Sequence, residues 1–189
     1  MDIRSLGMDP TRVSSGESLA AVALVLSRGT AGDDVLVVRR ASVHGDPWSG
    51  HIALPGGRFQ AEDASLEETA RRETLEETGM DLGDSVCIAR LPDVSPRSAR
   101  APSVRVAPFV FRYDGPRQVV LSDELVEAWW IPVARLRRAE EWRPASVVVQ
   151  GGTTIEARGF DVSGHVLWGL TERVVALFLE SLPQSSRAD

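Results

Sequence analysis

The sequence predicts one domain with an α+β fold. A chain of 189 residues has the size of one ordinary domain and can bury a hydrophobic core without cross-links. Its 43% hydrophobic and 25% charged residues are typical of a globular protein. Strand-like segments outnumber helical ones and do not alternate regularly with them, which favours α+β over a doubly wound α/β sheet.

The first two strands are predicted to form a hairpin that leads into a shaped loop. Residues 20–27 are a continuous apolar run, typical of a buried strand. Residues 35–39 are a second such run, and the Gly- and Asp-rich turn between the two predicts a hairpin. Residues 45–57 then contain four glycines and two prolines, a density of chain breakers that indicates a loop of defined conformation.

A helix is predicted over residues 66–78. Ser65, with Glu68 three residues later, matches the capping-box pattern at a helix start. Gly79 suits the left-handed position that commonly ends a helix. No glycine or proline interrupts the segment between them.

The second half of the chain is predicted to contain more strands and a closing helix. We expect strands at residues 85–91, 104–113, 119–121 and 126–131, a short helix within 132–138, and a hairpin of 147–149 with 153–157 around Gly151-Gly152. Residues 165–182 are apolar at helical spacing and predict an amphipathic helix. The predicted domain therefore spans residues 18–182, after a polar arm (1–17) and before a C-terminal tail (183–189) that should fray.

Composition excludes several classes of function. The net charge of −6 argues against non-specific binding to nucleic acid. A single cysteine, Cys87, excludes an intramolecular disulfide and a cysteine-rich zinc site. The apolar runs are far shorter than the ~18–20 residues that span a bilayer, and the first 18 residues lack the apolar core of a signal peptide. We expect a cytoplasmic protein that binds neither nucleic acid nor a membrane.

The helix 66–78 carries the most informative chemistry. Glu73 and Glu77 lie only about 40° apart around a helix, on the same stripe as Leu66 and Ala70, so the stripe should face the body of the domain. Glu76 lies on its flank. Carboxylates this close raise each other's pKa, and a hard divalent cation such as Mg²⁺ or Mn²⁺ would relieve the repulsion. The alternative is a solvated, glutamate-rich helix face, which the shared apolar stripe disfavours.

This segment resembles the Nudix hydrolase signature. The family pattern runs Gly, five residues, Glu, seven residues, then Arg-Glu-apolar-x-Glu-Glu-x-Gly-apolar. Residues 72–80, RETLEETGM, match its second half and depart from it only at Thr74. The first half fits less well: the first Glu of the pattern would fall on Ala64, which a one-residue insertion after Gly57 would explain.

The resemblance implies a fold and a reaction. The fold would be an α/β/α sandwich with a mixed sheet between the signature helix and a C-terminal helix, here residues 165–182. The reaction would be metal-dependent hydrolysis of a diphosphate joined to another moiety, in which the ion activates water and neutralises phosphoryl charge. Mg²⁺ or Mn²⁺ is the implied cofactor. A homodimer is left open, since many members of the family are dimers.

Roles for individual residues also follow from the resemblance. Glu73, Glu76 and Glu77 match the metal-binding positions, and a backbone carbonyl near Gly57 often adds a ligand in the family. Arg72 matches an arginine that pairs with the signature carboxylates. Some members place a catalytic base in the loop that contains Glu124; the alternative is an ordinary loop carboxylate.

The flanking segments resemble the coenzyme A diphosphatase branch of the family. Residues 39–42, 46–57 and 166–171 carry this likeness, although His51 stands where the branch has Gln, Leu54 where it has Phe, and the spacing from Arg40 to Gly50 differs. Coenzyme A or acyl-coenzyme A would then be the substrate. The alternatives are ADP-ribose or another nucleotide sugar or dinucleotide, a nucleoside triphosphate, or a Nudix-fold nucleotide-binding module without catalysis.

Several further residues are candidates for substrate binding. A guanidinium group matches the geometry of phosphate oxygens, which makes candidates of Arg39, Arg40, Arg58, Arg97 and Arg100. His51, beside the Gly-Gly turn, is a further candidate. For each of them the alternative is a solvated or loop-packing side chain.

Overall fold

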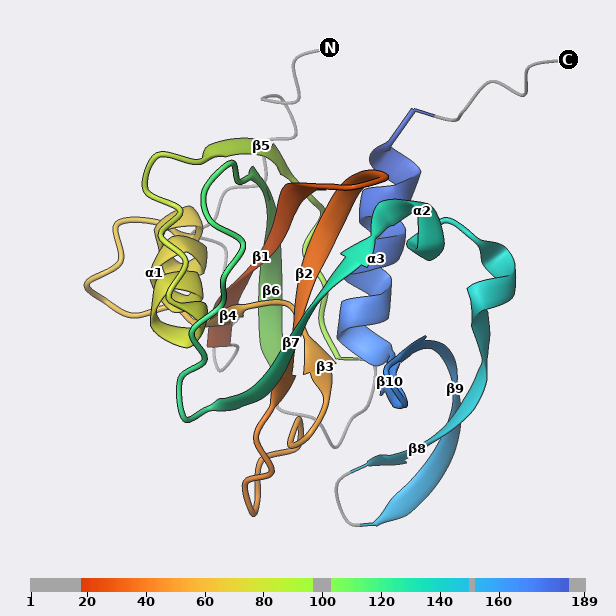
Figure 1. Cartoon of the computed structure of the whole chain (residues 1–189). Coiled ribbons are helices and arrows are strands. Elements are labelled where there is room, and N and C mark those ends of the chain that lie inside the picture. Colours follow the sequence, from red (N-terminus) through yellow and green to blue (C-terminus); the bar gives the residue numbers. More distant parts are fainter. Residues whose placement is uncertain (1–17, 97–102, 150–151, 184–189) are drawn as a thin grey trace, which may run out of the picture.

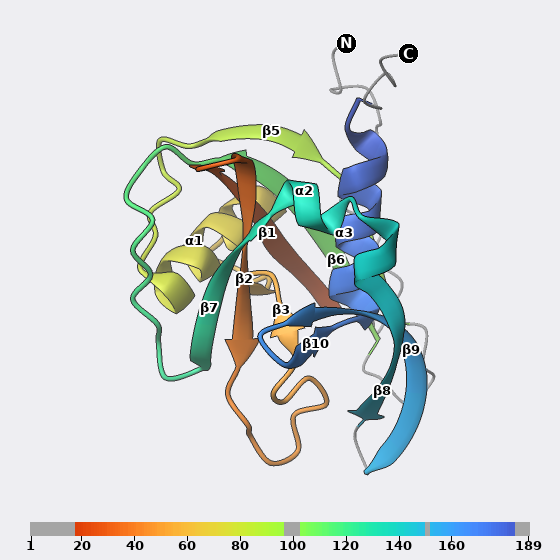
Figure 2. The same cartoon turned by 45° about the vertical axis from the view of Figure 1, so that its right-hand side comes forward.

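The protein is a mixed β-sheet covered on its two faces by different helices. The computed structural model describes residues 18–96, 103–149 and 152–183. Helix α1 (Leu66–Thr78) lies on one face of the sheet and α3 (Gly169–Ser181) on the other, as the two views in Figures 1 and 2 show. The predicted α+β sandwich is confirmed. The arm 1–17 and nearly all of the tail 183–189 lie outside the described residues.

The sheet is built around the first strand. β1 (Ser18–Gly29) pairs antiparallel with β2 (Gly32–Arg40), as predicted, and parallel with β6 (Val104–Arg112). Four further strands complete it in the order β3-β2-β1-β6-β5, with β4 paired to β1 and β7 to β2. These are β3 (Ile52–Ala53), β4 (Gly56–Arg58), β5 (Val86–Arg90) and β7 (Leu125–Pro132).

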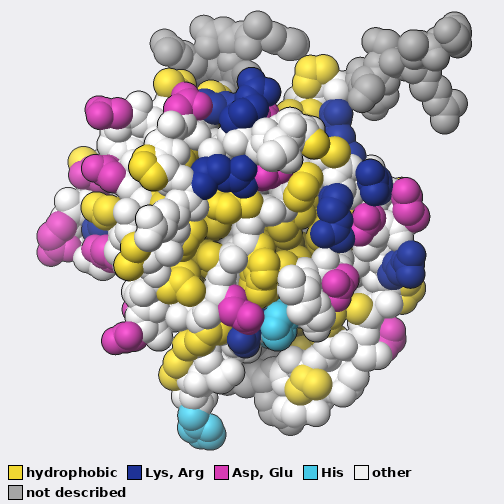
Figure 3. Space-filling view, in the orientation of Figure 1, with side chains coloured by type: hydrophobic (Ala, Val, Ile, Leu, Met, Phe, Trp, Pro, Cys, Tyr) yellow, Lys and Arg dark blue, Asp and Glu magenta, His cyan; other side chains and the backbone are white. Residues whose placement is uncertain are grey.

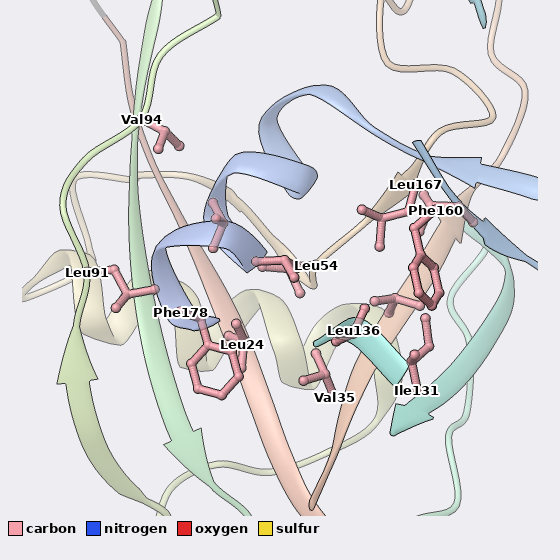
Figure 4. Close-up of a cluster of buried hydrophobic side chains, with 14 of the residues drawn as sticks. Leu24, Val35, Leu54, Leu91, Val94, Ile131, Leu136, Phe160, Leu167 and Phe178 are labelled. Atoms are coloured by element: carbon pink, nitrogen blue, oxygen red, sulfur yellow. The ribbon is translucent and has the colours of Figure 1, made fainter. Parts of the chain in front are cut away.

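Alternation along β1 divides the core into two layers. Ala21, Ala23 and Val25 are fully buried on the side of α1, whereas Leu24 and Leu26 are buried on the side of α3. Period-two alternation is expected of a strand covered on both faces. The α1 side offers mostly small side chains, so the helix packs close to the sheet. Figure 4 shows the α3 side, where Phe178 of α3 lies beside Leu24.

Helix α1 begins and ends where its sequence predicts. Ser65 accepts a hydrogen bond from the Glu68 N–H at 3.1 Å, and Gly79 ends the helix with a left-handed φ of 68°. The one departure from the signature pattern, Thr74, is fully buried and donates its hydroxyl to the Ala70 carbonyl at 2.7 Å. The helix backbone therefore satisfies the polar atom at a position where an apolar side chain is usual.

A second, smaller sheet follows the first. β8 (Trp142–Val149), β9 (Thr153–Val162) and β10 (His165–Leu167) form an antiparallel sheet of three strands. Its β8–β9 hairpin, much longer than predicted, projects past the start of α3 (Figures 1 and 2). Short helices, α2 (Val133–Leu136) and a 3₁₀ turn (Ala139–Glu141), connect it to β7.

Two predicted elements are wrong. Residues 165–182 are not one helix, because 165–167 pair with β9 as β10 and Gly169 then takes a φ of 69° at the helix start. Residues 119–121 are not a strand. Around them, the N–H groups of Val120 and Ser122 donate at 2.9 and 3.0 Å to the carbonyls of Thr78 and Glu77 at the end of α1.

A buried ion pair fixes the loop that leads into α1. Asp63 accepts from Arg72 Nε at 2.8 Å and Nη2 at 3.0 Å, from the Thr69 hydroxyl at 2.8 Å and from the Gln60 N–H at 3.0 Å. The hydrogen bonds from Arg72, with further help from Gln60 and Thr69, hold the pKa of Asp63 well below its usual range against the opposing effect of burial. Loop and helix are thereby joined through one carboxylate.

We expect Asp63→Asn to destabilise the protein by about 2–3 kcal/mol at pH 7, because it removes a charged acceptor of several hydrogen bonds. Since the pKa of Asp63 is depressed by folding, its contribution is complete above the unfolded pKa near 4 and is lost as pH falls further. The free energy of unfolding, measured with urea, should therefore fall more between pH 7 and pH 3 for wild type than for Asp63→Asn. Asp84→Asn, at an exposed position, is the control and should keep the pH dependence of wild type. An equal pH dependence of the free energy of unfolding in wild type and Asp63→Asn would contradict the role of Asp63.

Candidate active site

The predicted carboxylates meet at one end of a large cavity. The cavity has a volume of about 1330 Å³ and lies between the main sheet, the start of α3 and the β8–β9 hairpin. Its lining includes Glu73, Glu77, Glu124 and Arg40, which we call the acidic end, together with the backbone of Gly56 and Gly57. These groups come from four separate segments of the chain.

Two glycines bring the carboxylates of α1 against the backbone of β4. The Gly56 N–H donates to Glu77 Oε2 at 2.9 Å. A Cβ at Gly56 would overlap the Ala21 carbonyl of β1, and its φ of 152° is unfavourable for other residues. A Cβ at Gly57 would overlap the carboxylate of Glu73. The Gly-Gly pair is therefore required by this close approach.

The two carboxylates are held away from water. Glu77 is only 4% exposed, and burial raises its pKa to about 7, against the lowering effects of the Gly56 N–H and Arg40. Burial also raises the pKa of Glu73, although its hydrogen bond to Arg72 opposes this. Repulsion from Glu124 adds to both increases. Desolvated carboxylates that repel one another favour a proton or a cation.

The third signature glutamate, Glu76, pairs with Arg72 and does not line the cavity. Arg72 donates to Glu73 at 2.9 Å and to Glu76 at 3.0 Å, and the Glu76 side chain is 57% exposed on the flank of the helix. Within the described part of the chain, no three acidic, histidine or cysteine side chains form a ready-made metal cluster. The oxygen donors, their burial and their raised pKa values nevertheless fit a hard divalent cation.

The segment before β7 places Glu124 at the acidic end. Its backbone is fixed from both sides: the Ala41 N–H donates to the Glu124 carbonyl at 2.8 Å, and Ser122 is bonded to the end of α1. Further back, Arg117 bonds Asp34 at 2.6 Å and lies 4.5 Å from the ring centre of Trp130. A segment without regular structure is therefore held by specific contacts.

The predicted basic residues divide between the cavity and other partners. Arg40 and Arg58 line the cavity. Arg40 pairs with Asp46 at 3.1 Å and lies 4.0 Å from Glu77, and its buried Nε has no hydrogen-bond partner among the described residues. Arg39 instead pairs with Glu127 at 2.5 Å and does not line the cavity. Arg97 and Arg100 lie outside the described residues.

His51 lines the cavity as part of an aromatic group. Its ring meets that of Trp168 edge-on, with centroids 5.0 Å apart, and Trp48 lies in the same lining. Desolvation lowers the pKa of His51, so the ring is neutral at pH 7. A neutral aromatic surface suits stacking against a flat ligand group.

Sequence reasoning missed how the start of α3 holds the cavity walls together. Thr171 donates to the Ile52 carbonyl of β3 at 3.0 Å, Glu172 accepts from Arg158 of β9 at 2.6 Å, and Arg173 donates to the Ser95 carbonyl at 2.6 Å. We call these three consecutive residues the α3 clamp. Their partners are distant in sequence, so no local signal could have identified them.

The described residues form no extended basic area on the face that Figure 3 shows. Arginine side chains there are interspersed with acidic ones instead of forming an extended basic area, unlike the basic surfaces that bind nucleic acid. In the described segments, every helix is too short or too polar to cross a bilayer.

Comparison with known proteins agrees with the fold and the signature helix. The model of the NUDIX domain family matches residues 17–150. An uncharacterized protein of Schizosaccharomyces pombe is 36% identical over 107 residues, which cover 54% of this chain and 32% of that protein. Nudix hydrolase 3 of Caenorhabditis elegans is 30% identical over 132 residues, 67% of this chain and 53% of that protein. The chain thus spans about a third of the first of these curated relatives and about half of the second.

A solved structure shows the same fold. A MutT/nudix family protein from Enterococcus faecalis superposes with a TM-score of 0.62 at 21% identity, covering 89% of this chain and 63% of the other. The family match covers most of the chain and includes β4, α1 and Glu124. The chain therefore belongs to the Nudix family.

Proposed function

We propose that this chain is a hydrolase that uses Mg²⁺ or Mn²⁺ to cleave a nucleoside diphosphate linked to another moiety. The observation that carries the proposal is the pair of desolvated carboxylates, Glu73 and Glu77, held against the Gly56-Gly57 backbone at the end of a large cavity. Membership of the Nudix family and the printed name of the C. elegans relative support the same reaction class.

The metal ligands would be Glu73 and Glu77, with the Gly57 carbonyl and Glu76. Glu76 is exposed, so it can leave Arg72 by a change of side-chain rotamer and turn toward the ion. A bound divalent cation supplies Lewis-acid stabilisation of phosphoryl charge and lowers the pKa of water. Arg72 keeps α1 docked through Asp63 whether or not Glu76 moves.

Other residues of the cavity would bind the substrate and move a proton. Glu124 faces Glu73 and Glu77 and would accept the proton of the attacking water. Arg40 and Arg58 would contact phosphate oxygens, with Arg40 presenting a buried N–H that has no partner among the described residues. The neutral ring of His51, with Trp168, would contact a flat group of the substrate. Arg39 is assigned no contact with substrate, because Glu127 holds it.

We further propose coenzyme A or acyl-coenzyme A as the substrate. The support is the likeness of residues 39–42, 46–57 and 166–171 to that branch of the family, and a cavity volume of about 1330 Å³, which exceeds the ~300–1,000 Å³ of common ligand sites. ADP-ribose, another nucleotide sugar or a dinucleotide is the second candidate. A module that binds nucleotide without cleaving it is the third.

A substrate panel tests these candidates. We expect purified protein with Mg²⁺ or Mn²⁺ to show a higher kcat/KM for coenzyme A than for its 3′-dephospho form, ADP-ribose, NADH or nucleoside triphosphates. A cationic side chain paired with the 3′-phosphate would account for the preference. A substrate without that phosphate would leave the buried cation unpaired, which is costly. More efficient cleavage of ADP-ribose would overturn the coenzyme A assignment and leave the hydrolase assignment. Binding without any cleavage would overturn both.

We expect Glu73→Gln and Glu77→Gln each to lower kcat/KM by at least about 100-fold, since each removes a negative charge that would stabilise the ion and the transition state. Steady-state kinetics at several Mg²⁺ concentrations measures this, with circular dichroism to verify folding. Glu67→Gln is the matched control on the same helix, because Glu67 lies outside the cavity and pairs with Arg71. Wild-type kinetics in both test variants would remove these residues from the site.

Metal affinity should depend on pH through Glu77. A proton and a cation compete for the same carboxylate, and the pKa of Glu77 is about 7. The apparent affinity for Mn²⁺ should therefore rise by about tenfold between pH 6 and pH 8, measured as free Mn²⁺ by electron paramagnetic resonance. In Glu77→Gln the rise should be much smaller; an unchanged rise would assign the titration to another group.

A further inference from the structure

The β8–β9 hairpin presents an apolar face to the cavity. Thr153, Ile155 and Ala157 alternate along β9 and all line it. Their register partners on β8 include Val149 and Val147, so this face of the hairpin is almost entirely aliphatic. Ile155 is 39% exposed although it faces inward to the cavity. An aliphatic side chain in this position lacks the packing partner that a closed core would supply.

The opposing wall is aliphatic as well. Val94, Val104 and Val106, from β6 and the segment that pairs with it, line the same cavity, and each is at most 8% exposed. Leu170 of α3 also lines it. The charged side chains of Arg158, Glu172 and Arg173 line the same cavity, but each is bonded within the protein, Arg158 to Glu172 and Arg173 to the Ser95 carbonyl. We call this part the aliphatic limb: Val94, Val104, Val106, Ile155, Ala157 and Leu170.

The limb is held in shape by the α3 clamp. Glu172 ties β9 to α3 through Arg158, and Arg173 ties the segment beside Val94 to α3 through the Ser95 carbonyl. Both walls of the limb are therefore fixed to one helix turn, and a preformed apolar surface binds ligand at a lower entropic cost than a flexible one.

The limb is distinct from the aromatic part of the lining. Trp168 directly follows β10, which pairs with residues 160–162 of β9. Because Leu167 pairs with Phe160 in this antiparallel register, Trp168 lies toward Gly159 of β9. Ile155 is four residues from Gly159 along that strand, a separation of about 13 Å. An aromatic surface suits a flat heterocycle, whereas an aliphatic surface without aromatic rings suits a saturated chain.

We propose that the aliphatic limb binds a saturated hydrocarbon chain carried by the moiety that is linked to the nucleoside diphosphate. The inference rests on the proposed function and deepens it, because the acidic end and the limb belong to one continuous cavity. The diphosphate lies at Glu73 and Glu77, and the chain extends between β9 and the valines of the main sheet. Ile155 is thereby a specificity-determining residue that contacts substrate away from the reacting atoms.

The experiment uses alkyl esters of ADP that carry a methyl, butyl or octyl group on the β-phosphate. With wild-type protein and Mg²⁺, we expect each added methylene to lower KM by up to about fourfold until the limb is full, with a smaller effect on kcat.

Ile155→Glu should abolish this dependence on chain length. The matched control is Val148→Glu, on the other face of the same hairpin, where the side chain is 64% exposed; it should retain the wild-type dependence. Thermal melting establishes that both variants are folded, and Ile155→Thr, which keeps a β-branched side chain, should flatten the dependence if Ile155→Glu does not fold.

The outcomes separate this inference from the proposed function. Equal KM values for the three esters in wild type would overturn the limb and leave the hydrolase assignment. A lower KM for diadenosine diphosphate than for the octyl ester would also overturn it, by assigning the limb to a second nucleobase. If wild type cleaves neither the esters nor coenzyme A, the proposed function fails. Whenever the esters are not cleaved, calorimetry decides the limb alone: tighter binding of the octyl than of the methyl ester supports it, and equal binding overturns it.

Discussion

The site depends on one close approach, that of the α1 carboxylates to the backbone of β4. The helix lies near enough to the strand for the Gly56 N–H to reach Glu77, and Gly57 leaves room for Glu73 only because it has no side chain. Small side chains on the α1 side of β1 allow this approach, and the Gly56 backbone is itself packed against Ala21. Sheet, glycines and helix therefore act as one unit, in which a larger side chain at any of these contacts would displace the acidic end.

This approach concentrates negative charge, and the surrounding residues manage it in two ways. Arg72 joins Asp63, Glu73 and Glu76 in a single network, which stabilises these three carboxylates and docks the helix. Glu77 has, among the described residues, only the Gly56 N–H and the more distant Arg40 as stabilising partners, so its raised pKa reflects a negative charge that these partners do not compensate. Such uncompensated charge is destabilising and is characteristic of binding and catalytic sites.

The parts that could be predicted from sequence are those with local causes. Ser65, Glu68 and Gly79 fixed the ends of α1, and the spacing of Glu73 and Glu77 placed both toward the domain, because caps and helical periodicity act over a few residues. The strand β10 was missed because its apolar residues continue the helical spacing of α3, and only pairing with β9 distinguishes the two. Arg39 has the side chain of a phosphate ligand, but it pairs with Glu127, which is 88 positions away in the sequence. Contacts at such separations leave no trace in a local pattern.

The separation of the two sheets affects which substitutions the fold can tolerate. β8, β9 and β10 pair among themselves and not with the main sheet; they join it through buried side chains such as Phe160, seen beside Leu136 in Figure 4, and through the α3 clamp. Substitutions on the inward face of the hairpin change one wall of the cavity while the backbone pairing that supports α1 stays intact. Substitutions on the smaller sheet can therefore change ligand preference without compensating changes in the main sheet.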